Sequence, residues 1–378
     1  MDHEPREALK MENTVEENEA GSRIDGKTYA KAYHSILCDD MPDFILEYSS
    51  LPIVQRLDGV GLLCGTDWTP LFDNKFFYSR LDHSIGVALI IWKFTHDKVQ
   101  ALSGLFHDIA SPAFSHVIDF RNGDFEKQES TEYSTREMIN DDLFLSENLF
   151  HDGIYKYEID DYHKYPIADN PIPGLNADRL EYMYPSGAAL DGTWTFGQIK
   201  DNYSFTSLLK NEKGLDEIGF SDMDAAAKYT EKFLNISTML QKNEDKLSMK
   251  LLADTISKAI ECGFLSDDDL YELDEVSIVR CFDRIIRENQ REEIVSESIT
   301  EFAKLWGTFR QMKKIERSDS PIKNAYNISL QVKKRYVDPL VKTSTGAERL
   351  SKINSGIAKQ IEDFLNFKDS EYGAVPWL

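Results

Sequence analysis

The sequence predicts an all-α, mainly helical fold. Apolar residues recur at helical spacing from about Tyr29 onward, for example at Phe44, Ile45 and Tyr48. Residues that commonly cap or begin helices stand before several of these stretches. Alternation with β-branched residues, which is typical of a strand, occurs at residues 327–336. We therefore expect a helical core with a helical C-terminal extension and a small strand element.

The expected helices follow one another along most of the chain. Pro52 stands near one helix start, and Ser79 with Asp82 three residues later forms a capping-box-like start for another. Asn176 is a possible cap after residues 152–175, whose Tyr, Asp and Pro content predicts a structured loop. The helices are expected near residues 44–48, 52–63, 80–94, 99–110, 178–183, 225–240, 247–262, 277–288 and 293–313.

The domain organisation follows from composition and length. Residues 1–24 are acidic and contain few large apolar side chains, which predicts a disordered tail. We expect residues 25–240 to form the catalytic core. Residues 241–378 are expected to form a helical region that packs on this core, because one hydrophobic core stops growing near roughly 250 to 300 residues.

The chain carries a strong negative charge. Its formal net charge is −23 over 378 residues. Long-range electrostatics would repel the phosphate backbone of nucleic acids and anionic lipid surfaces. We therefore expect neither a membrane nor extended nucleic acid as a partner. A small phosphorylated substrate remains compatible, because metal ions and a few local cations can reverse the field inside one pocket.

The cysteines and apolar stretches indicate a cytoplasmic protein. Cys38, Cys64, Cys262 and Cys281 show no CxxC spacing, which argues against a disulfide framework and a zinc–thiolate site. The longest apolar stretch, residues 87–92, is far shorter than the ~20 residues of a membrane span. The N-terminus lacks the pattern of a secretory signal.

Three polar residues are placed to bind a divalent cation. His83 and His107 lie on two consecutive predicted helices, and Asp108 directly follows His107. Two imidazoles and a carboxylate can therefore converge where the helices pack side by side. Such a group suits a divalent metal ion. A fourth ligand would have to come from elsewhere in the chain.

Three motifs resemble the HD-domain phosphohydrolase superfamily. They read RLDHSIGV at residues 80–87, HDIASPAFSH at residues 107–116 and NADRLEY at residues 176–182. Their order, spacing and flanks resemble the dNTP triphosphohydrolase (dGTPase-like) branch. The resemblance is close over residues 52–184, and a weaker similarity occurs at residues 333–340.

The resemblance implies a metal-binding, all-helical core. Asp178 would be the fourth ligand, beside His83, His107 and Asp108. A divalent ion held there would activate water and hold phosphate oxygens. The mixed ligand set does not decide among Mn, Fe, Zn, Ni and Mg, and Mn or Fe is the working choice.

The resemblance also implies roles for residues around the metal. Arg80, Arg179 and Tyr182 would contact the substrate, with Arg80 facing its phosphates. His116 and Asp119 would line the same pocket. Together with Asp108 they form the expected catalytic group.

Four departures from the family pattern affect catalysis and specificity. Ser111 and Gln128 stand where the family usually has the two histidines of a proton relay, and neither can act as an acid near neutral pH. His163, in the loop before Asp178, could supply the missing imidazole. Leu62 and Ser186 replace polar residues that read base and sugar in relatives.

The expected function is hydrolysis of a nucleotide by a metal-dependent phosphohydrolase. Release of triphosphate from a deoxynucleoside triphosphate is the leading hypothesis. The alternatives are a phosphomonoesterase or phosphodiesterase acting on another small phosphate compound, and a catalytically weak nucleotide-binding sensor. The expected partners are the small nucleotide or phosphate substrate and, from the resemblance, further copies of the chain in a homo-oligomer.

Overall fold

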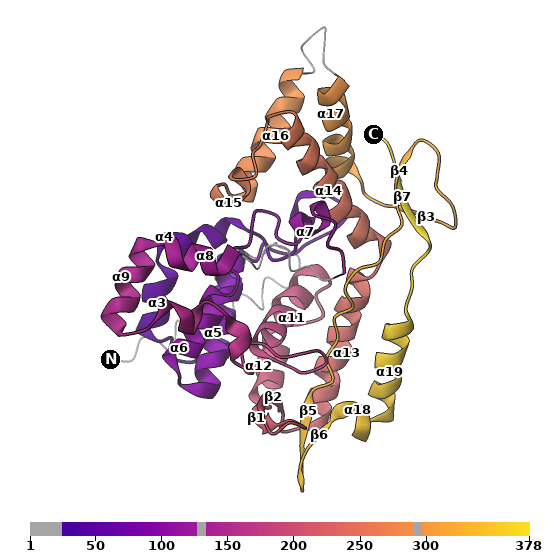
Figure 1. The fold of residues 1–378 in the computed structure, drawn as a ribbon. Coiled ribbons are helices and arrows are strands. Elements are labelled where there is room, and N and C mark those ends of the chain that lie inside the picture. Colours follow the sequence, from indigo (N-terminus) through magenta and orange to yellow (C-terminus); the bar gives the residue numbers. More distant parts are fainter. Residues whose placement is uncertain (1–24, 127–133, 290–296) are drawn as a thin grey trace.

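Helices dominate the fold, and two small sheets complete it (Figure 1). The computed structural model describes residues 25–126, 134–289 and 297–378. The acidic tail expected at residues 1–24 lies outside the described residues. The described residues are mainly helical, as the sequence predicts, but they contain more strand than the small element expected.

The first half of the chain is helical. The capping box at Ser79 is confirmed, because its hydroxyl accepts from the Asp82 N–H and the Asp82 side chain accepts from the Ser79 N–H. Asn176 is confirmed as a cap, because its side chain accepts from Arg179 N at 2.7 Å. The elements are α2 (Gly26–Leu37), α3 (Asp43–Ser49), α4 (Pro52–Gln55), the 3₁₀ helices η1 (Arg56–Gly59) and η2 (Thr66–Trp68), α5 (Arg80–Thr95), α6 (Lys98–Phe106), α7 (Val117–Arg121), α8 (Ser134–Asp141), α9 (Leu143–Asp152), α10 (Lys156–Ile159), the 3₁₀ helix η3 (Tyr162–Lys164), α11 (Ala177–Leu190) and α12 (Phe196–Ser204).

Helices also make up most of residues 223–311 and return near the C-terminus. The helices expected at residues 225–240, 247–262 and 277–288 are present, each with boundaries shifted by a few residues. The elements are α13 (Met223–Leu240), α14 (Asn243–Glu261), α15 (Asp269–Glu272), α16 (Glu275–Asn289), α17 (Glu297–Gln311), α18 (Leu350–Ile353) and α19 (Ser355–Asn366).

Two predicted helices are shorter than expected. The helix that begins at Pro52 gives way to the 3₁₀ helix η1 and ends at Gly59, and the next residues turn back toward Ser79. The Cβ of any other residue at Gly59 would lie 2.3 Å from the Asp274 Cβ, so a close approach of α16's N-terminal side requires glycine here. The helix expected to reach residue 110 ends at Phe106, which places His107 at its C-terminal cap.

Two sheets were not predicted as such. The first has the order β1-β2-β5-β6, with β2 and β5 parallel and the other pairs antiparallel. The second is antiparallel, with the order β3-β7-β4. The strands are β1 (Thr206–Lys210), β2 (Asp216–Phe220), β3 (Glu316–Ser318), β4 (Ala325–Ile328), β5 (Leu340–Thr343), β6 (Gly346–Arg349) and β7 (Tyr372–Pro376).

The strand expected at residues 327–336 is largely wrong. Strand β4 ends at Ile328, and residues 329–339 cross the molecule without a sheet partner. Leu330 and Val332 are partly buried against the core in this segment. Their alternation with polar residues therefore reflects packing on one side of an extended chain. The expected loop at residues 152–175 is confirmed, apart from the short helices α10 and η3.

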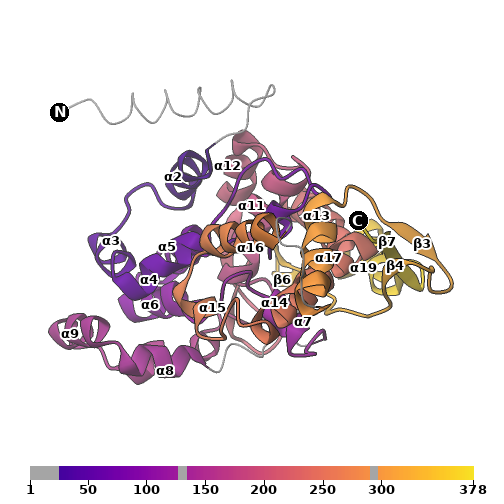
Figure 2. The same cartoon turned by 90° about the horizontal axis from the view of Figure 1, so that it is seen from above.

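Two hydrophobic clusters hold these elements together. One is formed by α2 to α6, α8 to α13, α18 and α19 with β2 and β5, and the other by α7, α14, α16 and α17 with β4 and β7. Figure 2 shows α8 and α9 at the edge of the molecule, away from the α14–α17 group. None of the helices in the described parts combines the length and apolar character needed to cross a membrane.

Candidate metal centre

The first turn of α5 carries two residues of the site. The Ser79 and Asp82 capping box fixes where α5 begins, and Lys27 on α2 donates to both Asp82 oxygens at 3.1 Å. Arg80 and His83 follow from this start, one turn apart, so that both side chains lie on the face of α5 that meets the end of α6. A local cap thus fixes the place of His83, one of the predicted ligands.

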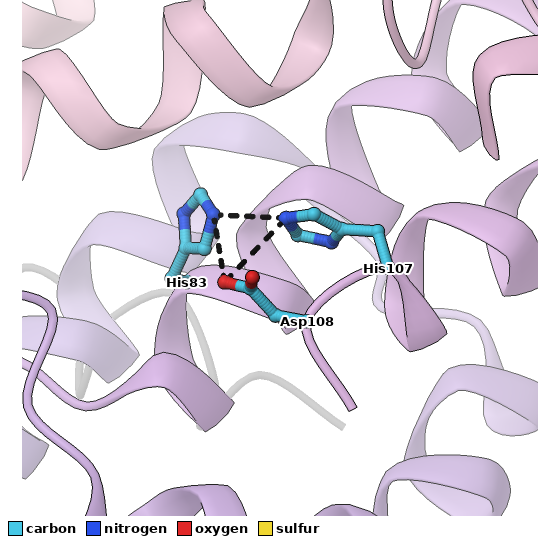
Figure 3. Close-up of side chains that lie close together, drawn as sticks. All are labelled: His83, His107 and Asp108. Carbon is cyan, nitrogen blue, oxygen red and sulfur yellow. Dashed lines mark hydrogen bonds and ion pairs between the residues drawn. The ribbon is translucent and has the colours of Figure 1, made fainter. Parts of the chain in front are cut away.

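His107 points its ring at His83 from the end of α6 (Figure 3). Its Nδ1 lies 2.7 Å from the Gly104 carbonyl oxygen, which can only accept, so Nδ1 carries a proton. Its Nε2 lies 3.2 Å from the Nε2 of His83. The two imidazoles therefore meet through the nitrogens that remain available as ligands.

Glu181 on α11 orients His83 from behind. One carboxylate oxygen pairs with His83 Nδ1, and the other accepts a hydrogen bond from the Tyr78 hydroxyl at 2.7 Å. Glu181 is fully buried. Gly86 makes room for it, because a Cβ at residue 86 would lie 2.5 Å from a Glu181 oxygen. A carboxylate behind a ligating imidazole fixes its tautomer and direction.

Two carboxylates complete the group. One Asp108 oxygen lies 3.7 Å from His83 Nε2 and 3.6 Å from His107 Nε2. One Asp178 oxygen lies 3.2 Å and 3.9 Å from the same two nitrogens. The structure therefore brings all four predicted ligands together. We call His83, His107, Asp108 and Asp178 the four-residue cluster.

The electrostatics of the cluster favour positive charge at its centre. Burial alone would lower the pKa of His83, but Glu181 and Asp178 outweigh it and raise this pKa to about 10. Burial raises the pKa of Asp108, while Arg80 and the imidazoles hold it well below its usual range. Despite its burial, the pKa of Asp178 is lowered to about 2, chiefly by its hydrogen bond to His83. Both carboxylates are therefore ionised near neutral pH.

This donor set fits a divalent metal ion. The ligand atoms of His83, His107 and Asp108 lie within 4.8 Å of one another, and Asp178 adds a second carboxylate. Both rings use Nδ1 for a partner outside the cluster, so a cation that displaces the proton from His83 Nε2 would meet two lone pairs directed at the same point. Imidazole and carboxylate together admit several divalent ions, so the donor set leaves the identity of the metal open.

Arg80 and His116 lie beside the cluster. The Arg80 guanidinium pairs with Asp108 through Nη1 and donates from Nε to the Ser115 hydroxyl at 2.6 Å. His116 Nδ1 lies 2.8 Å from an oxygen of the fully buried Asp119. Burial lowers the pKa of His116, and the charge of Arg80 lowers it further. His116 is therefore neutral near pH 7, with Nδ1–H directed at Asp119.

The Arg179 guanidinium is engaged by other groups of the protein, whereas the resemblance implies that it contacts the substrate. Its guanidinium donates to the Asn170 side chain at 2.9 Å, to the Gly174 carbonyl at 2.8 Å and to the Asn170 carbonyl at 2.6 Å. It also lies 3.5 Å from an Asp169 oxygen. Arg179 thus lines the pocket while its donors hold the loop that precedes α11.

Tyr182 and His163 also line the pocket. The Tyr182 hydroxyl is buried and has no hydrogen-bond partner among the described residues. His163 lies on η3, and its Nδ1 is 2.7 Å from an Asp169 oxygen. Asp169 also accepts from Asn176 at 2.6 Å, which ties the His163 loop to the start of α11.

The departures from the family pattern have distinct places. The Ser111 hydroxyl donates to Asp108 at 3.2 Å, so a hydroxyl stands beside the cluster where the family pattern has an imidazole. Leu62 and Ser186 both line the pocket. Gln128 lies outside the described residues.

The cluster forms one wall of a cavity of about 650 Å³. Residues from both hydrophobic clusters line it, including Met183 and Ile236 from one and Phe120 and Met249 from the other. The extended segment of residues 329–339 closes one side with Arg335. The cavity therefore depends on the N-terminal and the C-terminal halves of the chain together.

Three residues that form or support the site escape the sequence analysis. Glu181 has a weak signal, since it follows Asp178 by three residues on the same helix. Arg335 lies in the weaker segment of resemblance, 157 residues after Asp178, and nothing local indicates that it reaches the pocket. Glu275, which accepts from Gly61 N at 2.9 Å and Phe114 N at 3.0 Å, has no sequence signal at all.

Comparisons with known proteins find relatives in sequence and solved structures of similar fold. No protein-family model matches the chain. The uncharacterized protein YdhJ of Bacillus subtilis is 27% identical over 263 residues, which cover 64% of this chain and 70% of that protein. The metal-dependent phosphohydrolase cns2 of Cordyceps militaris is 25% identical over 151 residues, which cover 39% of each chain.

Two crystal structures share the fold. A phosphohydrolase from Bacteroides thetaiotaomicron has a TM-score of 0.57 at 14% identity, covering 89% of this chain and 96% of that one. A hypothetical protein from Aquifex aeolicus has a TM-score of 0.56 at 14% identity, covering 87% and 91%. The shared fold thus spans most of the chain.

Proposed function

We propose that this protein is a metal-dependent phosphohydrolase of the HD type that acts on a nucleotide. The observation that carries the proposal is the convergence of two imidazoles and two carboxylates on one wall of a cavity of about 650 Å³. The relative named as a metal-dependent phosphohydrolase and the phosphohydrolase structure of the same fold support this class.

The four-residue cluster would hold a divalent cation. Such an ion supplies neutralisation of phosphoryl charge and activation of water. Glu181 keeps Nε2 of His83 directed at the cluster, and the Gly104 carbonyl does the same for His107. Arg80 adds a fixed positive charge beside Asp108, where charge would build up on a phosphoryl group during hydrolysis.

Two histidines are suited to proton transfer. Neutral His116, with Nδ1–H directed at Asp119, can accept a proton at Nε2. His163, paired with Asp169, is our candidate for the group that protonates the leaving oxygen. In this assignment His163 takes over the part of the family histidine whose position Ser111 occupies in this chain.

A nucleotide fits the shape and chemistry of the cavity. The volume lies within the ~300–1,000 Å³ range of small-molecule sites. Away from the cluster, the lining is largely apolar, which suits a base. This apolar part includes Leu62, Met183, Leu190, Ile236, Leu240 and Met249. The resemblance of the three motifs favours a deoxynucleoside triphosphate, hydrolysed to nucleoside and triphosphate.

A second candidate is a nucleotide-binding sensor with weak catalysis. The observation in its favour is the Ser111 hydroxyl at 3.2 Å from Asp108, because a hydroxyl there cannot transfer protons near neutral pH as an imidazole does. This candidate predicts nucleotide binding without turnover.

Product analysis tests the proposal. The purified chain is incubated with Mn, Fe, Zn, Ni or Mg and a panel of dNTPs, NTPs and nucleoside monophosphates, and products are separated by ion exchange. We expect triphosphate release from a dNTP. Asp178→Asn, which removes one carboxylate of the cluster, should reduce the rate at least 100-fold. Asp363→Asn, an equivalent change on the exposed face of α19, should leave it unchanged.

The other outcomes have defined meanings. Phosphate or pyrophosphate as the product would replace the triphosphohydrolase with a phosphomonoesterase or phosphodiesterase. Nucleotide binding without turnover at any metal would establish the sensor. Equal rates for Asp178→Asn and Asp363→Asn would reject the cluster as the catalytic centre.

A further inference from the structure

The cations that line the cavity differ in whether the protein already uses them. Arg80 is engaged by Asp108 and Ser115, and Arg179 by the loop before α11. Arg335 also lines the cavity, but its side chain makes no hydrogen bond or ion pair with the described residues. Of these three arginines, Arg335 is therefore the one whose five N–H donors remain for a ligand.

The backbone around Arg335 is fixed on both sides. Lys333 O accepts from the Gln241 side chain at 2.9 Å, and Asp338 N donates to the Pro173 carbonyl at 2.8 Å. The segment is thus anchored to the end of α13 and to the loop before α11. This anchoring holds Arg335 at the cavity at a small entropic cost when a ligand binds.

The charge of Arg335 reaches the residues beside the cluster. It lowers the pKa values of His116 and Tyr182, in both cases beside the larger effect of burial. It acts in the same direction on Asp245, whose pKa burial raises to about 7. Asp245 lines the same cavity and would, when ionised, partly offset the guanidinium charge.

The Tyr182 hydroxyl is a second hydrogen-bond donor that lines the cavity and is left for a ligand. It is buried, it has no hydrogen-bond partner among the described residues, and it lies within range of the Arg335 charge. A buried hydroxyl without a partner carries a free-energy cost, because it has lost its hydrogen bonds to water without gaining others. A ligand that accepts a hydrogen bond there removes this cost.

We propose that Arg335 and the Tyr182 hydroxyl form an anion subsite that binds a second phosphoryl group of the substrate, beyond the group held at the four-residue cluster. The inference rests on the proposed function for the first phosphoryl group. It assigns the substrate to compounds that carry at least two linked phosphoryl groups, and it makes Arg335 the residue that discriminates them from monophosphates. A guanidinium and a hydroxyl match the acceptor oxygens of such a chain.

Calorimetric titration with inorganic tripolyphosphate and orthophosphate, in the presence of Mn²⁺, tests the subsite without requiring turnover. Arg335→Gln should weaken tripolyphosphate binding about tenfold or more and change orthophosphate binding less than about threefold, since only the longer anion reaches both places. The matched control is Arg280→Gln, an exposed residue on α16 outside the cavity lining. Arg335→Lys should restore part of the loss, because it keeps the charge but not the two-point geometry.

Tyr182→Phe provides a second, milder variant. It removes only the unpartnered hydroxyl, so the melting temperature should not fall while tripolyphosphate binding weakens several-fold. This variant decides the question if Arg335→Gln melts well below the wild type. Wild-type protein that does not bind tripolyphosphate, or binding by Arg335→Gln and Tyr182→Phe equal to that of Arg280→Gln, would overturn the subsite.

The test separates this inference from the proposed function. If the wild type binds tripolyphosphate in an Arg335-dependent way but hydrolyses no nucleotide, the subsite stands and the hydrolase proposal fails. If Arg335→Gln releases triphosphate at the same rate and with the same KM as the wild type, the hydrolase proposal stands and the subsite fails.

Discussion

Glu181 determines which nitrogen His83 presents to the cluster. A carboxylate only accepts hydrogen bonds, so it selects the tautomer with the proton on Nδ1 and leaves Nε2 as a ligand atom. The Tyr78 hydroxyl satisfies the other oxygen of the buried carboxylate. Gly86 leaves the space that Glu181 occupies. Glu181 thus orients a predicted metal ligand without being one of the four predicted ligands itself.

Glu181→Gln should weaken metal binding. The Gln amide nitrogen would donate where the carboxylate accepts, which favours the tautomer with the proton on Nε2 and blocks the ligand atom. We expect the affinity for Mn²⁺ to fall about 10- to 100-fold, measured by calorimetric titration. Glu147→Gln, the same change at an exposed residue of α9, is the control. Equal affinities of the two variants would contradict the orienting role.

At the scale of elements, α16 positions two loops of the site through its first residue. Glu275 accepts from Gly61 N, Phe114 N and the Trp68 indole, at 2.9, 3.0 and 2.6 Å. Phe114 and Ser115 both have positive φ angles, of 64° and 54°, which are unfavourable for residues with side chains. This strained turn is held by the hydrogen bond that Phe114 N donates to Glu275 and by the one that Arg80 Nε donates to the Ser115 hydroxyl. His116 follows the turn.

Glu275 should give the stability of the protein a specific pH dependence. Burial raises its pKa from 4.5 to about 7. Between these values the folded state keeps a proton that the unfolded state has released, so the free energy of unfolding falls as the pH rises. Over this window the contribution of Glu275 amounts to roughly 3 kcal/mol, at about 1.4 kcal/mol per pKa unit.

The comparison with Glu275→Gln isolates this contribution. Urea unfolding of both proteins, in the presence of a chelator, is measured at several pH values from 4.5 to 7.5. The stability of the wild type relative to the variant should decrease as the pH rises. A difference that stays constant over this range would show that Glu275 does not titrate there.

At the scale of the whole molecule, the site lies where the two hydrophobic clusters meet. The four-residue cluster comes from α5, the end of α6 and α11, while Asp245, Met249 and Arg335 come from the C-terminal half. Helices α18 and α19 pack back onto the first hydrophobic cluster, so the end of the chain is folded against its beginning. The cavity therefore exists only when both halves are folded.

Metal binding should stabilise the folded chain as a whole. An ion that binds only the folded state at 100 times its dissociation constant adds about 2.7 kcal/mol to the free energy of unfolding. We expect Mn²⁺ to raise the melting temperature in a concentration-dependent way, followed by calorimetry. Asp178→Asn should abolish most of this increase and Asp363→Asn none of it. An increase of equal size in both variants would place the ion elsewhere.

Sequence signals that involve only neighbouring residues predicted many of the helices. The capping box at Ser79, the cap at Asn176 and the helical apolar spacing depend on residues within a few positions of each other, so they predict where α5, α11 and the helices of residues 223–289 begin or run. The pattern around His83, His107 and Asp108 predicted the cluster that the structure brings together, with Asp178 added from the resemblance.

Contacts between distant segments were decided by the tertiary structure alone. The partners of Arg179, the approach of Glu275 to Gly61 and Phe114, and the position of Arg335 in the cavity join residues that are far apart in the chain or that only a specific loop path brings together. A residue type predicts what a side chain can bind, but burial and neighbours decide what it does bind. The sequence by itself therefore determined most of the helices and pointed to the residues of the four-residue cluster, and only the folded chain decided which cations of the cavity are already engaged by other residues.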